Sequence, residues 1–203
     1  MNKEWSELNK TMQAQIKKKD TYKMGIDTLF NLRRQLMQTL VSFKEDLCRE
    51  DFNAIPFINA DGYHSKTIAY SIWHIFRIED IVAHTVITED EQVFFTGNYQ
   101  VRINSPIITT GNELVKQQIA DFSKQLNLEE LYSYIFEVRE STEKILERFS
   151  YDELKWKIPD ERKGYLKSLN VVNCDEKAIW LIDYWCSKDI RGLIQMPFSR
   201  HWI

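Results

Sequence analysis

Helix-breaking residues are scarce in this chain, and long apolar repeats fill the tracts between them. The 203 residues include six glycines and four prolines. The clearest repeat covers residues 128–149, where apolar or small side chains recur at alternating spacings of three and four. This heptad pattern is typical of helices that pack nearly antiparallel. Because Asn127 and Glu130 form a capping pair at its start, the tract predicts one continuous helix.

A second apolar seam covers residues 22–43 and predicts another long helix, interrupted only by Arg33. A third helix is expected over residues 65–87. Its centre is the strongly apolar segment 71–80, which contains His74.

The last long helix is expected over residues 175–191, with Asn173 as its cap and Gly192 as its stop. A shorter helix is expected over 110–125, where Thr110 and the glutamate three residues later form a capping pair. These assignments complete a set of four long helices and one short helix.

Turn-forming residues mark two connecting regions, 50–62 and 88–109, which we expect to be loops. Neither is a linker that could separate two domains. We therefore expect a single all-α domain over residues 1–203, with 1–20 as an N-terminal helical extension. Four amphipathic helices joined by long crossovers and short extra helices are typical of a helix bundle.

Charge and composition exclude several functional classes. Lys and Arg total 27 against 30 Asp and Glu, a net charge of −3, which gives no basic surface for nucleic acid. No apolar run approaches the roughly 20 residues of a membrane span, and the first residues do not resemble a signal peptide. Three cysteines without C-x-x-C spacing favour a reducing compartment. The sequence predicts a cytoplasmic protein without a membrane or nucleic-acid partner.

His74 is the most informative polar residue because it lies within a strongly apolar helix. A buried imidazole without a partner costs about 1–3 kcal/mol, so His74 is expected either to be hydrogen-bonded in the core or to line a cavity. At 100° per residue, Tyr70 and Arg77 lie beside it, while Glu79 falls inside the apolar stripe. With Trp185 from the facing helix, these residues form the candidate pocket.

Several short segments resemble the DinB-like (YfiT-like) helix-bundle superfamily. They are the helix with His74 followed by Phe-Arg-Ile-Glu-Asp, the segment 128–142, and the chain end 192–201. The resemblance implies a four-helix bundle, often a homodimer, with a divalent metal held by three histidines. Some relatives are transferases or isomerases that use a low-molecular-weight thiol. Many have no assigned activity.

The resemblance assigns the first metal histidine to His74, but this chain departs from the rest of the pattern. The expected H-x-x-x-H pair on the last helix reads Cys186 and Ile190 here. Isoleucine cannot bind a metal, so a metal set would consist of His74, Cys186 and His201. Asp183 and Asp189 on either side of Cys186 could also contribute.

Two functional hypotheses remain open at this point. In the first, the metal site is degenerate, no cofactor is required, and the protein binds a small molecule or acts as a stress-related accessory protein. In the second, zinc or nickel binds at a rebuilt site around His74 and Cys186 and supports transfer of a small thiol. A purely structural homodimer is a third possibility. We further expect His201 in an exposed tail, His64 and His84 at the surface, and His74 close to Cys186.

Overall fold

The computed structural model describes residues 3–57 and 65–202. Within these ranges every regular element is a helix, which confirms the all-α prediction. None of the described helices combines the length and the apolarity required to cross a membrane. His64 and the last part of the predicted connecting region, residues 58–62, lie outside the described residues.

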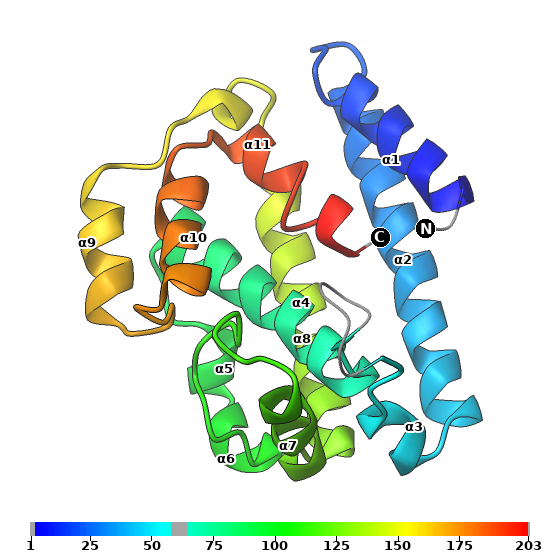
Figure 1. Ribbon diagram of the computed structural model, residues 1–203. Helices are drawn as coiled ribbons and strands as arrows, with labels where there is room; N and C mark the ends of the chain where they lie inside the picture. Colours follow the sequence, from blue (N-terminus) through cyan, green and yellow to red (C-terminus); the bar gives the residue numbers. More distant parts are fainter. Residues whose placement is uncertain (1–2, 58–64, 203) are drawn as a thin grey trace.

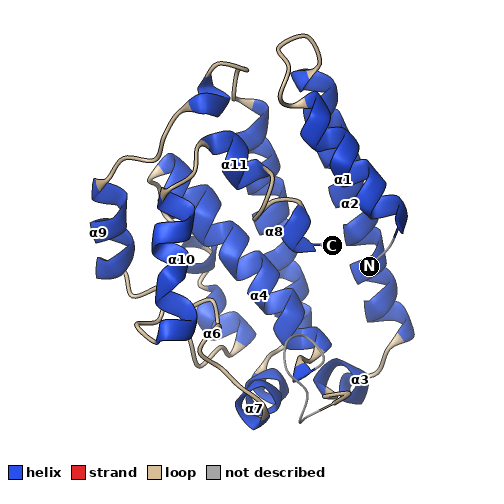
Figure 2. Ribbon diagram, turned by 45° about the horizontal axis from the view of Figure 1, so that its top comes forward, coloured by secondary structure: helices blue, strands red, loops and turns tan. Residues whose placement is uncertain are grey.

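The helix α4 (Ile68–Asp80) lies at the centre of the molecule, between α2 on one side and α10 on the other (Figures 1 and 2). It continues directly into a π-helical segment, Ile81–Thr88. The other elements are α1 (Lys3–Gln15), α2 (Tyr22–Asp46), α3 (Arg49–Asn53), α5 (Val93–Thr96), α6 (Tyr99–Ile103), α7 (Gln117–Gln125), α8 (Leu128–Glu147), α9 (Glu161–Ser168), α10 (Glu176–Cys186) and α11 (Ile190–Ile194). Two short 3₁₀ turns, Glu153–Lys155 and Arg200–Trp202, complete the described elements.

The heptad helix forms as its sequence predicts. α8 begins after Asn127, whose side chain accepts a hydrogen bond from the backbone N–H of Glu130. Ile135 and Val138, in the middle of the seam, are completely buried. The helix ends at Glu147, close to the predicted limit.

The N-terminal helix α1 turns back and packs along α2 (Figure 1). Gly25 permits this close approach, because a Cβ atom at that position would lie 2.4 Å from Cγ2 of Ile16. The lack of a side chain is therefore useful here, although glycine inside a helix ordinarily reduces stability. α1 becomes part of the hydrophobic core through Met12, which is completely buried.

Two charges that interrupt apolar seams, Arg33 and Glu79, neutralise each other in the core. Arg33 donates from Nη2 to Oε1 of Glu79 at 2.7 Å and from Nη1 to Oε2 at 3.0 Å, and both side chains are fully buried. Arg33 also contacts Glu143 of α8 at 3.2 Å. Two buried charges are tolerated only when they are paired and hydrogen-bonded in this way. The pair therefore joins α2, α4 and α8.

The prediction for the last long helix was right about its start to within one residue, but wrong about its capping residue and its end. Asp175, rather than Asn173, caps α10, and the helix stops at Cys186. The Asp189 side chain accepts the backbone N–H of Gly192 and so starts a new helix, α11, which contains the glycine expected to be the stop. The backbone is extended at Asp189 and forms an isolated bridge with Lys157, which separates the two helices.

Other boundaries also differ from the sequence-based prediction. The helix expected from residue 110 begins at Gln117, because Thr110 bonds to Asn112 and Lys116 has a positive φ of 48°. Glu113 pairs with Thr109 instead of Thr110. The two predicted connecting regions contain the short helices α3, α5 and α6.

Candidate functional site

His74 is fixed in one orientation by a backbone carbonyl. The N-cap of α4 is Thr67, and the helix places the His74 ring against the segment 109–112. The Nδ1 atom lies 2.7 Å from the Thr110 carbonyl oxygen. A carbonyl can only accept, so Nδ1 carries the proton and Nε2 keeps its lone pair. Nε2 has no hydrogen-bond partner among the described residues.

A glycine shapes the backbone that holds His74. Gly111 has a φ of 77°, a left-handed conformation that glycine adopts readily. Its carbonyl oxygen accepts a hydrogen bond from the Tyr70 hydroxyl at 2.9 Å. Tyr70 in turn stacks on the His74 ring, with the ring centroids 5.5 Å apart and the planes inclined by 11°. Two successive carbonyls of this turn therefore orient two neighbouring aromatic side chains of α4.

The C-terminal turn brings a second histidine to the same place. The rings of His74 and His201 are perpendicular, with their centroids 5.1 Å apart. The expectation of an exposed tail for His201 was wrong, since its side chain is half-buried. The next residue, Trp202, anchors the turn. Its ring packs edge-on against Phe76, with the ring centroids 4.6 Å apart, and its indole N–H donates to Oε2 of Glu79 at 2.9 Å.

Both imidazoles are neutral at physiological pH. Burial lowers the pKa of His74 from 6.5 to about 4, although its hydrogen bond to the Thr110 carbonyl opposes this change. Burial, together with the proximity of His74, lowers the pKa of His201 to about 3. Neutral imidazoles can accept hydrogen bonds or bind metals.

The two histidines line a cavity of about 270 Å³ between α4, α10 and the chain end. Its other walls come from apolar and aromatic side chains, with one amide. They are Ile78, Asn112, Trp180, Leu181, Tyr184, Trp185, Met196 and Pro197. The residues from 112 and from 196–197 were not predicted, because a short turn and a chain end carry no periodic signal. Gly111 was the one available sign of a special turn.

The sequence-predicted pocket residues fall into two groups. Trp185 lines the cavity with His74, and Tyr70 stacks behind it. Glu79 instead pairs with Arg33 in the core. Arg77 is also buried, and it donates to the Gln92 side chain at 2.6 Å and to the Ile108 carbonyl at 3.0 Å. These two charged residues support the helix rather than face the cavity.

Cys186 does not line the cavity and lies at the opposite side of α10. Its nearest charges are Lys163 and Arg162 of α9, and burial raises the pKa of its thiol. Asp183 pairs with Lys163 at 2.7 Å, and Asp189 caps α11. The α10 positions that line the cavity with His74 include Leu181 and Trp185, an i, i+4 pair without metal-binding atoms.

The donor set does not fit the three-ligand metal centre that the family resemblance implies. Residues 3–57 and 65–202 contain no group of three His, Cys, Asp or Glu side chains arranged to hold a metal ion. His74 and His201 supply two imidazoles, and stable zinc sites use three or four protein ligands.

His84 was expected at the surface and is instead buried and hydrogen-bonded at both ring nitrogens. Nδ1 lies 2.7 Å from Oδ1 of Asp90, and Nε2 lies 3.0 Å from Oγ of Ser141. The arrangement Asp90–His84–Ser141 resembles the Asp–His–Ser triad of a serine hydrolase. However, Ser141 lies within α8, where the neighbouring backbone N–H groups are used by the helix and cannot form an oxyanion hole. We therefore assign a structural role to this trio.

The prediction for His84 failed because the helix changes its winding. Residues 81–88 form a π-helical segment, so the 100° step that placed His84 on the outer face does not apply there.

No protein-family model matches this sequence, and the comparison with curated proteins likewise gave no match.

Proposed function

We propose that this protein binds a small organic molecule in the cavity between His74 and His201, without a resident metal. The observation that carries this proposal is the Nε2 atom of His74, which has an available lone pair on the wall of a mainly apolar cavity. A pocket with apolar walls and one or two fixed polar atoms is the usual form of a small-molecule site.

The chemistry of the walls defines the ligand class. Leu181, Trp185 and Pro197 favour an apolar or aromatic body, while Nε2 of His74 requires a hydrogen-bond donor. With about 270 Å³ available, the ligand is the size of one or two fused rings bearing an O–H or N–H group. Neither histidine is charged at neutral pH, so the site favours neutral molecules.

Matched pairs of probe molecules test this proposal. Indole and 1-methylindole differ in a single N–H donor, as phenol and toluene differ in a hydroxyl group. In isothermal titration calorimetry we expect indole and phenol to bind more tightly than their partners, by about tenfold for one hydrogen bond to a buried acceptor. The variant His74→Phe keeps an aromatic ring and should abolish this preference. Equal affinity within both pairs, or no binding of any probe, would contradict the proposal.

The metal content of the purified protein distinguishes this proposal from a metal-dependent function. Elemental analysis of protein purified without an affinity tag should show far less than one equivalent of zinc or nickel. Near-stoichiometric metal that is lost in His74→Ala would instead support the thiol-transferase hypothesis. As a control, Cys186→Ser should leave indole binding unchanged, because Cys186 does not line the cavity.

We also propose that the chain is a divergent DinB-like bundle. Four elements support this: the long helices α2, α4, α8 and α10, with a histidine at the middle of α4. In this proposal, apolar side chains on α10 replace the remaining metal ligands, and binding has replaced metal-dependent catalysis.

A further inference from the structure

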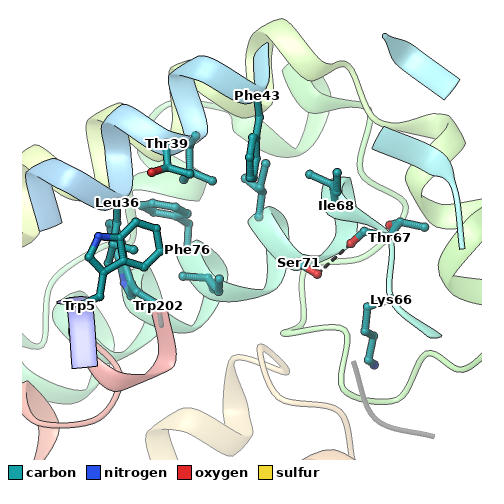
Figure 3. A pocket seen from close by; sticks show the side chains of 13 residues that line it. Trp5, Leu36, Thr39, Phe43, Lys66, Thr67, Ile68, Ser71, Phe76 and Trp202 are labelled. Atoms are coloured by element: carbon teal, nitrogen blue, oxygen red, sulfur yellow. Dashed lines mark hydrogen bonds between the residues drawn. The ribbon is translucent and has the colours of Figure 1, made fainter. Parts of the chain in front are cut away.

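Two cavities border helix α4, and they differ in the polar atoms that they offer to a ligand. The cavity between α4 and α2 has mainly apolar walls, with side chains such as Phe43 and Phe76 (Figure 3). Its hydroxyl groups are used within the protein; Ser71, for example, donates to the Thr67 carbonyl at 2.8 Å (Figure 3). Directional recognition of a ligand is therefore concentrated on the other side of α4, in the His74 cavity.

Asn112 is a second polar group on the wall of the His74 cavity, and its amide has a defined orientation. The Thr110 hydroxyl, which is completely buried, donates to Oδ1 of Asn112 at 2.7 Å. The Nδ2 group of Asn112 can only donate. It has no partner among the described residues, and it is not sealed inside the core. This N–H donor is therefore available to a ligand.

Thr110 orients both polar groups at once. Its carbonyl accepts from Nδ1 of His74 at 2.7 Å, and its hydroxyl donates to Oδ1 of Asn112 at the same distance. Each bond fixes one end of a planar side chain and leaves the other end free, an acceptor on His74 and a donor on Asn112. Because both side chains are one hydrogen bond from the same residue, the acceptor and the donor lie on the same side of the cavity.

Two other polar groups of the cavity impose no competing requirement. The indole N–H of Trp180 is used inside α10, where it donates to the Lys177 carbonyl at 2.9 Å. The neutral imidazole of His201 has one donor and one acceptor nitrogen, so it can adapt to either kind of ligand atom. The fixed pair on His74 and Asn112 therefore determines which ligands are preferred.

We propose that the ligand of this cavity is a cis amide, such as a lactam or a cyclic imide. The ligand N–H donates to Nε2 of His74, and the adjacent ligand C=O accepts from Nδ2 of Asn112. A cyclic amide presents this donor and this acceptor on neighbouring atoms of one rigid edge, and the apolar walls cover the rest of the ring system. This inference rests on the proposed function and specifies the ligand class within it.

Three bicyclic probes separate the two hydrogen bonds in isothermal titration calorimetry. Oxindole offers both the N–H and the C=O, indole offers only the N–H, and 1-methyloxindole offers only the C=O. We expect oxindole to bind about fivefold more tightly than either of the others, as one additional hydrogen bond provides. If indole binds and oxindole binds no more tightly, this inference is wrong and the proposed function stands. If no probe binds, both are wrong.

Variants assign the oxindole preference to particular atoms, and the readout is the ratio of oxindole to indole affinity. Asn112→Leu should bring the ratio close to one, and Asn112→Asp, whose carboxylate repels the ligand carbonyl, should bring it below one. Thr110→Val removes the hydroxyl that orients the amide and should lower the ratio, whereas Thr110→Ser should restore it. The exposed Gln100→Leu removes an amide elsewhere and serves as the control. A ratio in Asn112→Leu or Asn112→Asp equal to that of Gln100→Leu would overturn the inference.

Discussion

Replacing Glu79 with glutamine would leave the Arg33 guanidinium buried without its main counter-charge. Glutamine keeps the shape of the side chain, but its NH₂ group would face donors of Arg33 or the indole N–H of Trp202, which now meet carboxylate oxygens. Breaking a buried pair from one side costs about 3–5 kcal/mol. Arg33 keeps its contact with Glu143, whose side chain is 18% exposed, so we expect the lower end of this range.

A loss of about 3 kcal/mol corresponds to a fall in midpoint temperature of roughly 10 °C for a chain of this length. Urea unfolding followed by circular dichroism gives the free energy directly. Two variants serve as controls. Glu143→Gln should cost about 1 kcal/mol because that carboxylate is partly solvated. The double variant Arg33→Met with Glu79→Leu should recover most of the loss, since it removes both charges. The reasoning fails if Glu79→Gln is as stable as the natural protein, or if the double variant is less stable than Glu79→Gln.

Three further predictions concern acid stability, the chain end and assembly. Because burial lowers the pKa of His74 to about 4 and that of His201 to about 3, the unfolded chain binds more protons than the folded one below pH 6.5. Stability should therefore fall as the pH drops from 6.5 towards 4, and thermal melts of a His74→Phe and His201→Phe double variant should show a shallower fall. Trp202→Ala removes the contacts with Phe76 and Glu79 and should cost about 3 kcal/mol in urea unfolding, whereas the exposed Trp156→Ala should cost little. Light scattering should give twice the mass of one chain at micromolar concentration, as the family resemblance implies, and the mass of a single chain throughout a dilution series would contradict this.

Periodicity predicted the long helices because their packing repeats along the sequence. The seam of α8 identified Ile135 and Val138 as core residues, and Asn127 identified the start of the helix. The same patterns marked Arg33 and Glu79 as charges in apolar seams. Their pairing could not be predicted, because the two residues are 46 positions apart and only the packing of α2 on α4 brings them together.

The candidate site was predictable only in part, for the same physical reason. A histidine inside an apolar helix indicated either a hydrogen bond in the core or a position on a cavity wall, and His74 has both. Its partner is a backbone carbonyl, that of Thr110, and a carbonyl has no signature in the sequence. The position of His201 depends on one anchoring residue, Trp202, and the burial of His84 depends on a change of helical winding. Neither produces a periodic signal.

The tautomer of His74 tests the central claim most directly. A ¹H–¹⁵N spectrum of the imidazole nitrogens at neutral pH, assigned with His74→Phe, should show Nδ1 protonated and Nε2 unprotonated. Addition of indole should shift the Nε2 resonance as it accepts the ligand's N–H. A charged imidazole, a proton on Nε2, or a resonance that indole leaves unchanged would contradict the account of this cavity as a small-molecule site.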